Sequence, residues 1–492
     1  MSSPHTLLRN ATVLDGSGGP PRILDVALVE DRIAHIGAAL AVQAAHEIDA
    51  SGLALAPGFI DAHTHDDTAV VDHPQMLPKL SQGVTTVIVG NCGISASPVT
   101  LNGAPPDPMN LLGDAAAFRY PTFASYVEAV GHARPAVNVA ALVGHTALRN
   151  NHMDRLDREA GSGEIAAMRA QLQEALAHGA LGLSTGLAYR NANAASTAEV
   201  LALAQPLAAA GGLYATHLRT EADAVLDALD EAFCIGRHAR VPVVVSHLKC
   251  AGVANWGRSG EVLRALDEAR VSQPAGCDCY PYAAGSSTLD LRQVDPRLEI
   301  TITWSDAHPE VAGRALAQIA DAWNTSQLDA ARRLQRAGAI YHSIDEDDMR
   351  RILAHPATMI GSDGLPNDPH PHPRLWGAFP RVLGRYCRDE KLFPLPEAIR
   401  KMTSLSAERF GLVGRGRIRS GYFADLVLFD PLRIRDTATF GDPIRPAEGI
   451  QAVWVNGALA YTPAGATTNR AGRFLPRAPQ PAVRATAHVA SS

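Results

Sequence analysis

Short apolar runs alternate with helix-like stretches through the middle of this chain, and this alternation constrains the fold more than any other feature. Eight such runs can be placed, at residues 53–60, 84–89, 137–143, 180–183, 213–215, 241–245, 275–278 and 359–361. Strands that alternate with helices form a parallel sheet, because a parallel neighbour is reached only through a long crossover. The pattern therefore predicts an α/β fold, a TIM-like (β/α)8 barrel over residues 58–410.

The two ends of the chain carry a different pattern. Residues 6–57 have the pattern of short strands separated by turn residues. The same pattern occurs again at 424–429 and 453–461, where Asn456-Gly457 indicates a hairpin. We therefore expect a small β domain built from residues 1–57 and 411–480, followed by a flexible tail at 481–492. The gap before the eighth run is too long for one crossover, so we expect an insertion at about 285–345 near the barrel mouth.

Composition excludes several classes of protein. The chain of 492 residues has 44 basic and 50 acidic residues, a net charge of −6, and no basic run, so nucleic acid is not an expected partner. It has no run of eighteen apolar residues, so no membrane partner is expected either. Six cysteines are too few for a disulfide scaffold at this length, which favours a cytoplasmic setting. The sequence does not fix the oligomeric state.

Polar residues follow most of the apolar runs. In a βα barrel the carboxyl ends of the strands meet at one face, where the active site lies. The residues at these ends include four histidines, one cysteine and one carboxylate: His63, His65, Cys92, His217, His247 and Asp363. All are types that bind metal ions, and their convergence on one rim predicts a metal centre.

Each of these residues also has an ordinary structural explanation. His63 and His65 face the same way in an extended strand and can chelate one ion, yet such pairs also occur in surface loops. A buried Cys92 can be a small apolar residue, and Asp363 can form a turn between Ser362 and Gly364. His145, after the third run, either orients a ligand or closes its strand.

Several strings carry a family resemblance. GFIDAHTHDD (58–67) resembles the first barrel strand of the metal-dependent amidohydrolase superfamily, and GYFADLVLFD (421–430) is similar to its returning β domain. The chain is specifically similar to the N-acyl-D-amino-acid deacylases, or D-aminoacylases, in GVTTVIVGNCGIS (83–95), STGLAY (184–189), THLRTEAD (216–223), SHLK (246–249), CYPY (279–282), GSDG (361–364) and HPRLWGAFPRVLGRY (372–386). The resemblance extends from about residue 6 to about 460.

This resemblance implies zinc-dependent hydrolysis of N-acyl-D-amino acids to a carboxylate and a free D-amino acid. It assigns a tightly bound zinc to Cys92, His217 and His247, and a weaker metal position to His63, His65 and Asp363, with the cysteine sulfur able to bridge the two. It also assigns Asp363 as the general base and acid that moves a proton from water to the leaving amine, as the chemistry of amide hydrolysis requires. The D preference rests on the resemblance alone.

The substrate is an N-acyl amino acid with a free carboxylate, which the pocket must pair. Arg374 offers a bidentate fork for this group. The residues that match the family's substrate contacts are Lys249, Tyr189, Tyr280, Ser286 and Arg374. Neither the preferred side chain nor the preferred acyl group follows from the sequence.

Two other functions remain open. One is another amidohydrolase-fold amide or cyclic-amide hydrolase. Many relatives of that kind bridge their metals with a carboxylated lysine after the fourth strand, whereas this chain has Ser184-Thr185 there and no lysine between Lys79 and Lys249. The other is a catalytically silent scaffold, which is expected to lose ligands that this chain retains.

Overall fold

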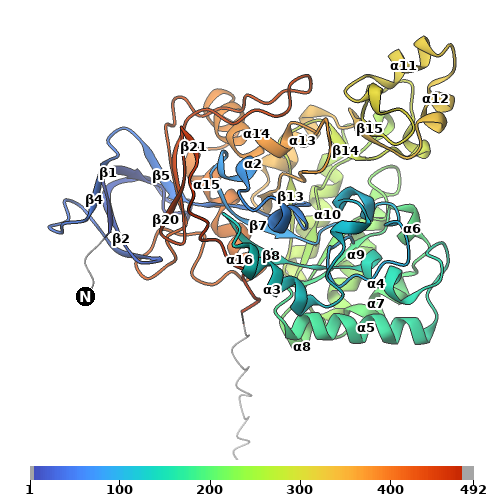
Figure 1. Cartoon of the computed structure of the whole chain (residues 1–492), viewed down its shortest axis with the longest axis horizontal. Coiled ribbons are helices and arrows are strands. Elements are labelled where there is room, and N and C mark those ends of the chain that lie inside the picture. The colour runs from blue at the N-terminus through green and yellow to red at the C-terminus, as the bar shows by residue number, and fades with distance from the viewer. Residues whose placement is uncertain (1–4, 479–492) are drawn as a thin grey trace, which may run out of the picture.

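The structure is a computed structural model that describes residues 5–478. One of its parts is a nine-stranded sheet that contains strands from both ends of the chain (Figure 1). Its strands are β1 (Thr6–Val13), β2 (Arg22–Val29), β3 (Arg32–Gly37), β4 (His46–Asp49), β5 (Ala54–Pro57), β18 (Leu426–Phe429), β19 (Ile450–Val455), β20 (Ala458–Thr462) and β21 (Gly465–Ala466).

The two ends of the chain meet where β5 pairs antiparallel with β18, in a register that sets Pro57 opposite Leu426. Alternating residues of these strands enter a shared core that includes Leu8, Leu28 and Trp454. The hairpin between β19 and β20 turns at Asn456 and Gly457, whose φ angles of 48° and 79° fit the tight turn that this dipeptide favours. The predicted tail at 481–492 lies outside the described residues.

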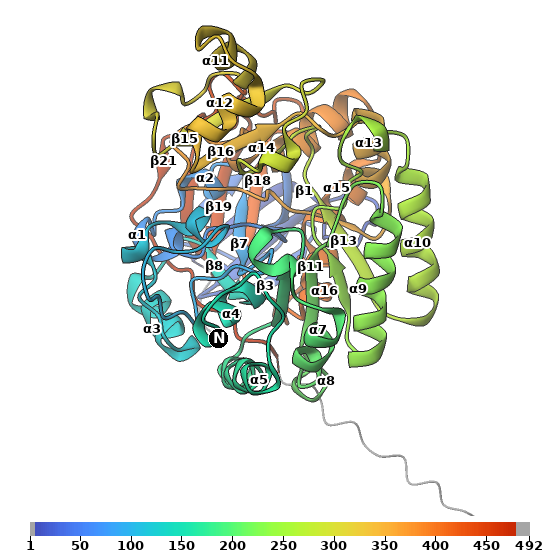
Figure 2. The ribbon, with the colours of Figure 1, turned by 90° about the vertical axis from the view of Figure 1, so that its right-hand side faces the viewer.

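Parallel strands form two further sheets in the middle of the chain, and helices cover their outer side (Figure 2). One has the order β6-β7-β8 and the other β17-β13-β12-β11-β10-β9. The strands are β6 (Phe59–Asp61), β7 (Val84–Val89), β8 (Asn138–Ala141), β9 (Val143–Gly144), β10 (Gly182–Gly186), β11 (Leu213–His217), β12 (Val243–Val245), β13 (Ala275–Cys279) and β17 (Thr358–Ile360). This is the α/β, parallel arrangement that the alternating pattern predicts.

Backbone contacts join these two sheets at both edges. β8 and β9 are separated by Leu142 alone, so the chain itself connects the sheets on one side. On the other side, Ala62 N donates to Ile360 O at 3.2 Å, and Thr64 forms a parallel bridge with Gly364. The segments that follow β6 and β17 are thereby held side by side.

The covering helices are amphipathic or largely buried. The main ones are α3 (Phe123–Ala133), α4 (His145–His152), α5 (Ser162–Ala177), α7 (Thr197–Ala204), α9 (Val225–Ala239), α10 (Ser259–Ser272), α13 (Glu346–Ala354), α14 (Arg374–Arg381), α15 (Leu395–Met402) and α16 (Ser404–Phe410). Short helices α1 (Ala69–Asp72), α2 (Leu77–Leu80), α6 (Arg190–Asn193) and α8 (Leu207–Ala210) lie between them. Asp345 caps α13 through its side chain, as the acidic run there suggests.

One detail of the predicted strands is wrong. The run 53–60 is one strand in the sequence pattern, but the structure divides it at Gly58 into β5, in the nine-stranded sheet, and β6, in the parallel sheet. A Cβ at Gly58 would lie 2.2 Å from the Thr85 side chain, so a glycine is required where the chain passes from one sheet to the other.

Residues between β13 and β17 fold into a separate antiparallel sheet, with strands β14 (Gly285–Thr288), β15 (Ile300–Ser305) and β16 (Ala337–Tyr341). Helices α11 (Leu316–Ala322) and α12 (Gln327–Leu334) project beside it (Figure 1). This unit has its own apolar core, which includes Ile302, Leu316 and Leu334. It occupies the stretch where the sequence pattern predicts an insertion.

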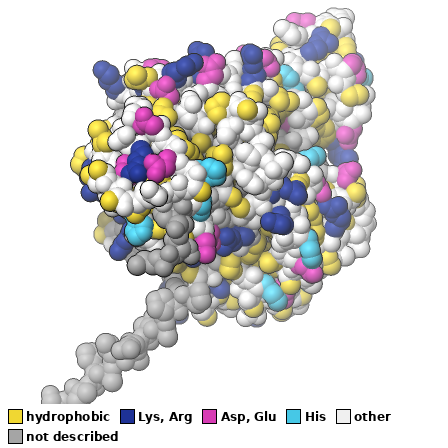
Figure 3. Space-filling model, turned by 60° about the vertical axis from the view of Figure 1, so that its left-hand side comes forward, with side chains coloured by type: hydrophobic (Ala, Val, Ile, Leu, Met, Phe, Trp, Pro, Cys, Tyr) yellow, Lys and Arg dark blue, Asp and Glu magenta, His cyan; other side chains and the backbone are white. Residues whose placement is uncertain are grey.

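Within residues 5–478, no helix is both long enough and apolar enough to cross a lipid bilayer. On the face seen in Figure 3, basic and acidic side chains lie among one another rather than gathering by sign.

Candidate metal centre

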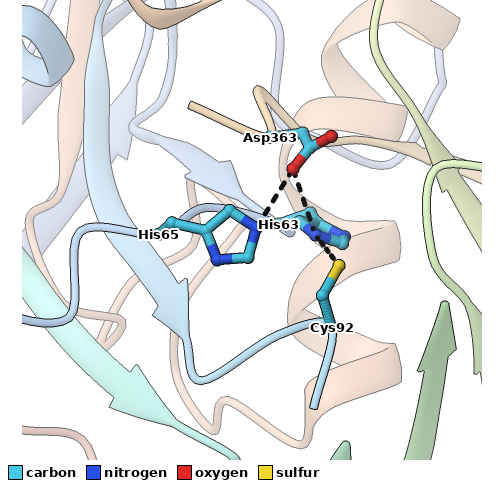
Figure 4. A group of neighbouring side chains, drawn as sticks. All are labelled: His63, His65, Cys92 and Asp363. Carbon is cyan, nitrogen blue, oxygen red and sulfur yellow. Dashed lines mark hydrogen bonds and ion pairs between the residues drawn. The ribbon is translucent and has the colours of Figure 1, made fainter. Parts of the chain in front are cut away.

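Four candidate ligands converge from the ends of three strands (Figure 4). His63 and His65 follow β6, Cys92 follows β7 and Asp363 follows β17. Cys92 Sγ lies 3.2 Å from His63 Nε2, and Asp363 Oδ1 lies 3.2 Å from His65 Nε2 and 3.5 Å from His63 Nε2. All four side chains are buried. We call these four residues the first donor group.

A second donor group consists of Cys92, His217 and His247. Cys92 Sγ lies 3.3 Å from His247 Nε2, and the ligating atoms of the three residues lie within 4.8 Å of one another. The Cys92 sulfur belongs to both groups. The structure thus brings together all six residues that the sequence analysis names as ligands.

Three of these candidate ligands have left-handed backbone conformations. The φ angles are 54° at Cys92, 34° at His247 and 49° at Asp363. Non-glycine residues rarely adopt such angles, and they persist where the surrounding structure holds them. Hydrogen bonds from the backbone nitrogens hold two of these residues: Asp363 N donates to His63 O at 2.7 Å, and His247 N donates to Asp278 Oδ1 at 2.9 Å.

The chemistry of the donors fits zinc. Imidazole nitrogen, thiolate sulfur and carboxylate oxygen are the ligands that zinc takes in proteins. Burial alone would raise the pKa of the Cys92 thiol, but the neighbouring His63 and His247 hold this pKa well below its ordinary value. A thiol whose pKa is lowered gives up its proton more readily, and the thiolate is the form that binds metal. A zinc ion at either donor group would have the Cys92 sulfur among its ligands, because Cys92 belongs to both groups.

Two further carboxylates orient the histidines. Asp278, in β13, lies 3.3 Å from His63 Nδ1, which leaves His63 Nε2 facing Cys92. Glu221 Oε1 lies 3.0 Å from His247 Nδ1. A carboxylate at the second ring nitrogen fixes the tautomer and orientation of a metal-binding histidine, as Asp278 would do for His63. At His247, Nδ1 faces both Glu221 and the Lys249 ammonium, which lies 2.7 Å from it.

Asp278 and Glu221 are not among the residues that the sequence predicts for this site. Asp278 is the last residue of the seventh apolar run and lies between two cysteines. Glu221 lies within the string THLRTEAD. The signal that could have pointed to Glu221 is its position four residues after His217.

Arg374 is buried beside the first donor group. Its Nη1 lies 2.9 Å from Asp363 Oδ2, and its Nη2 donates to the backbone oxygen of Ser286 at 3.0 Å. The guanidinium carbon also lies 4.6 Å from the centre of the Tyr280 ring. Arg374 therefore links the strand end that carries Asp363 to β14 of the insertion.

The remaining predicted substrate contacts lie around the same rim. Lys249 Nζ is 2.6 Å from Glu221 Oε1 and 2.7 Å from His247 Nδ1. The ring of Tyr189 lies 4.8 Å from that of His217. Ser286 Oγ is buried without a hydrogen-bond partner among the described residues, and it is free to accept or donate one to a ligand.

His145 is separate from both donor groups. Its Nε2 lies 2.9 Å from Glu199 Oε1, and Arg149 also pairs with this carboxylate. The sequence leaves two interpretations of His145 open. These contacts fit the one in which His145 closes the end of its strand.

The sequence pattern of the amidohydrolase family matches residues 46–461. The chain belongs to this family, which accords with the parallel α/β fold and with a metal-ligand set at the carboxyl ends of its strands.

Within the family, the chain is similar along nearly its whole length to one group of enzymes. The D-aminoacylase of Alcaligenes xylosoxydans xylosoxydans is 50% identical over 472 residues, which cover 96% of this chain and 97% of that protein. The N-acyl-D-aspartate deacylase of the same organism is 48% identical, over 95% of this chain and 94% of that protein.

A solved structure extends the comparison. The N-acyl-D-glutamate deacylase from Bordetella bronchiseptica, in complex with zinc and a phosphonate mimic of the tetrahedral intermediate, superposes with a TM-score of 0.93. It is 44% identical and covers 96% of this chain and 100% of its own. The group that these relatives define is that of the N-acyl-D-amino-acid deacylases.

Proposed function

We propose that this protein is a zinc-dependent N-acyl-D-amino-acid deacylase, which hydrolyses the amide bond to release a carboxylate and a free D-amino acid. The observation that carries the proposal is the pair of donor groups that share the Cys92 sulfur, with the Asp363 carboxylate beside them. The relatives that match nearly the whole chain support the substrate class and the D configuration.

Zinc would be held tightly by Cys92, His217 and His247, and a weaker metal position would consist of His63, His65 and Asp363 with the shared sulfur. Bound there, zinc would lower the pKa of a water molecule towards about 7 and would polarise the scissile carbonyl.

Asp363 moves the proton in this proposal. Burial opposes its charged form, but Arg374 and His63 outweigh that effect and hold the pKa of this carboxyl well below its ordinary value. Asp363 is therefore ionised at neutral pH and can accept a proton from the attacking water. The same carboxyl then passes the proton to the nitrogen of the leaving amine, which departs as a neutral amine.

The substrate carboxylate is paired by the cationic side of the pocket. Arg374 and Lys249 supply the positive charge, and Tyr189, Tyr280 and Ser286 supply hydroxyl groups at the same rim. Lys249 is already anchored by Glu221, so its ammonium is fixed in place before substrate arrives. A fixed cation costs less conformational entropy on binding than a mobile one.

We extend the proposal to the architecture. A closed eight-stranded barrel over residues 58–410, with a β domain from 1–57 and 411–480, is supported by two observations. The segment after β6 bonds to β17 and to the segment after it, and β5 pairs with β18. A cytoplasmic location, expected from sparse cysteines, stays part of this proposal, and the six cysteines are all unpaired.

A cyclic-amide hydrolase receives less support from the residues at the end of β10. Where a bridging lysine would lie, Thr185 directs its hydroxyl to Tyr214 and Thr216, each at 2.8 Å.

The test is amine release from matched N-acetyl-D- and N-acetyl-L-amino acids, with zinc-loaded protein and a chelated control. We expect release from the D series alone, lost on chelation and restored by zinc. Cyclic amides serve as the comparison substrates. Turnover of cyclic amides with both N-acetyl series inert would contradict the proposal.

A further inference from the structure

Lys79 is a fully buried lysine in α2, close behind the first donor group. Burying an ammonium group is costly unless it is paired and hydrogen-bonded, so the partners of Lys79 show what its burial accomplishes. In the sequence, Lys79 stands out only as one limit of the lysine-free stretch.

The Lys79 ammonium lies within 3.0 Å of four side-chain oxygens. Three of them come from the segment that carries His63 and His65: Asp61 Oδ2 at 2.8 Å, Thr64 Oγ1 at 2.9 Å and Asp66 Oδ2 at 3.0 Å. The fourth is Ser362 Oγ at 2.9 Å, from the residue directly before Asp363. One cation therefore contacts both segments that form the first donor group.

The oxygens around Lys79 are also bonded to one another. Ser362 donates to Asp61 twice, from its backbone N at 2.8 Å and from its hydroxyl at 2.6 Å. The Thr64 hydroxyl donates to Asp66 Oδ2 at 2.6 Å, and Gly364 N donates to Ser362 Oγ at 3.1 Å. The cluster is a closed network in which Lys79 is the cation that two carboxylates share.

We propose that Lys79 is a positioning residue that holds the turn of Asp363 against the segment of His63 and His65. It thereby sets the geometry of the weaker metal position and the place of the carboxylate that moves the proton. The second consequence rests on the proposed function, whereas the effect on metal binding does not depend on the reaction.

Lys401 provides a matched control. It is also fully buried, in α15, and its ammonium bonds His355 O and lies 3.4 Å from Thr358 O. Thr358 begins β17, whereas Asp363 follows the end of that strand. Two buried lysines thus support opposite ends of one strand, and the Lys79 end carries the ligands.

The experiment compares Lys79→Met with Lys401→Met in full-length protein. Zinc stoichiometry and affinity are measured by competition with a chromophoric chelator, beside kcat and KM. We expect Lys79→Met to keep one tight zinc while the affinity of the weaker position falls by about 10- to 100-fold. We expect a larger change in kcat than in KM. The reason is that Asp363 is displaced, whereas the cations Arg374 and Lys249 remain. Lys401→Met keeps both zinc affinities.

Gentler substitutions keep the test decisive if Lys79→Met does not fold. Ser362→Ala and Thr64→Val each remove one contact of Lys79 and leave the charges in place. We expect Ser362→Ala to weaken the second zinc by about 10-fold.

Two results would overturn the proposal. One is a folded Lys79→Met or Ser362→Ala protein with both zinc affinities unchanged. The other is an equal loss of zinc affinity at both metal positions, because the substitution would then disturb the whole centre and not the weaker position alone. If wild-type protein binds two zinc ions but fails to release D-amino acids, the proposed function fails while the zinc affinities still decide the role of Lys79.

Discussion

At the scale of single residues, the Cys92 sulfur occupies an unusual position, 3.2 Å from His63 Nε2 and 3.3 Å from His247 Nε2. An atom that belongs to both donor groups cannot be lost from one of them alone. Removing this sulfur should therefore weaken zinc binding at both positions, whereas removing a histidine should act on the position of its own group.

We expect Cys92→Ala to weaken zinc binding at both positions and to abolish turnover. Cys277→Ala is the control, because Cys277 is an equally buried thiol that bonds Thr358 Oγ1 and lies in neither donor group. Zinc content after gel filtration, together with kcat, measures the difference. A Cys92→Ala protein that retained one stoichiometric zinc would show that the sulfur is not shared.

Asp363→Asn should fold, retain the tight zinc and lose turnover by about 10²- to 10⁴-fold, because the amide cannot accept the proton from water. Asparagine suits the left-handed backbone at this position better than alanine does. Metal analysis and kcat at saturating substrate check the two parts separately. Near wild-type turnover would exclude Asp363 as the general base.

The candidate ligands can be predicted from the sequence because they come shortly after apolar runs, as His63, Cys92 and Asp363 do. Residues such as Asp278 cannot be, because their role comes from a partner far away in the chain. Asp278 contacts His63 across 215 positions, and no local pattern marks a buried carboxylate as the one that will orient a particular histidine.

At the scale of elements, apolar runs predict where strands occur but not to which sheet a strand belongs. The run 53–60 continues through Gly58, and the change of sheet there depends on the close approach of Thr85 from β7. The length of the gap before the eighth run predicts an inserted segment. Its antiparallel sheet depends on pairings such as Ser286 with Ile340, which the gap does not reveal.

The junction of α15 with β17 should give stability an alkaline pH dependence. Burial lowers the pKa of Lys401 from 10.5 to about 8. Between these values the unfolded chain binds a proton that the native state releases, so the free energy of unfolding rises with pH through this window. The contribution of this one group is about 3 kcal/mol.

Lys401→Met should lack this contribution. In urea unfolding between pH 7.5 and 10.5, the stability of wild type relative to the variant should therefore increase with pH. Lys391→Met, at an exposed lysine, is the control and should follow wild type. If the free energies of unfolding of wild type and Lys401→Met changed with pH in parallel, the lowered pKa of Lys401 would be contradicted.

At the scale of the whole molecule, a buried polar network joins the nine-stranded sheet to the parallel strands. Asn138 in β8 donates to Asp425 Oδ2 at 3.2 Å and accepts a bond from Asn456 Nδ2 at 2.8 Å. Asp425 also pairs with Arg415, and its backbone oxygen accepts from Gly58 N at 2.8 Å. The residues before β18 therefore hold the two parts of the chain together.

We expect Asp425→Ala to lower the free energy of unfolding by about 3–5 kcal/mol, because it leaves Arg415 buried without its partner. The kcat of the folded protein should not change, since the network lies away from both donor groups. Asp442→Ala removes an exposed ion pair with Arg445 and should cost less than about 1 kcal/mol. Equal stability of the two variants would show that the network does not join the two parts.

The left-handed backbone at Cys92, His247 and Asp363 also limits how this centre can diverge. A replacement at any of the three must both coordinate metal and tolerate a positive φ, and few residue types apart from aspartate, asparagine and histidine accept that conformation readily. Selection for a new metal chemistry therefore has few single-step routes at these positions. The insertion between β13 and β17 has its own core and bears no such restriction. Substitutions can therefore accumulate in that segment without disturbing the backbone of the candidate ligands.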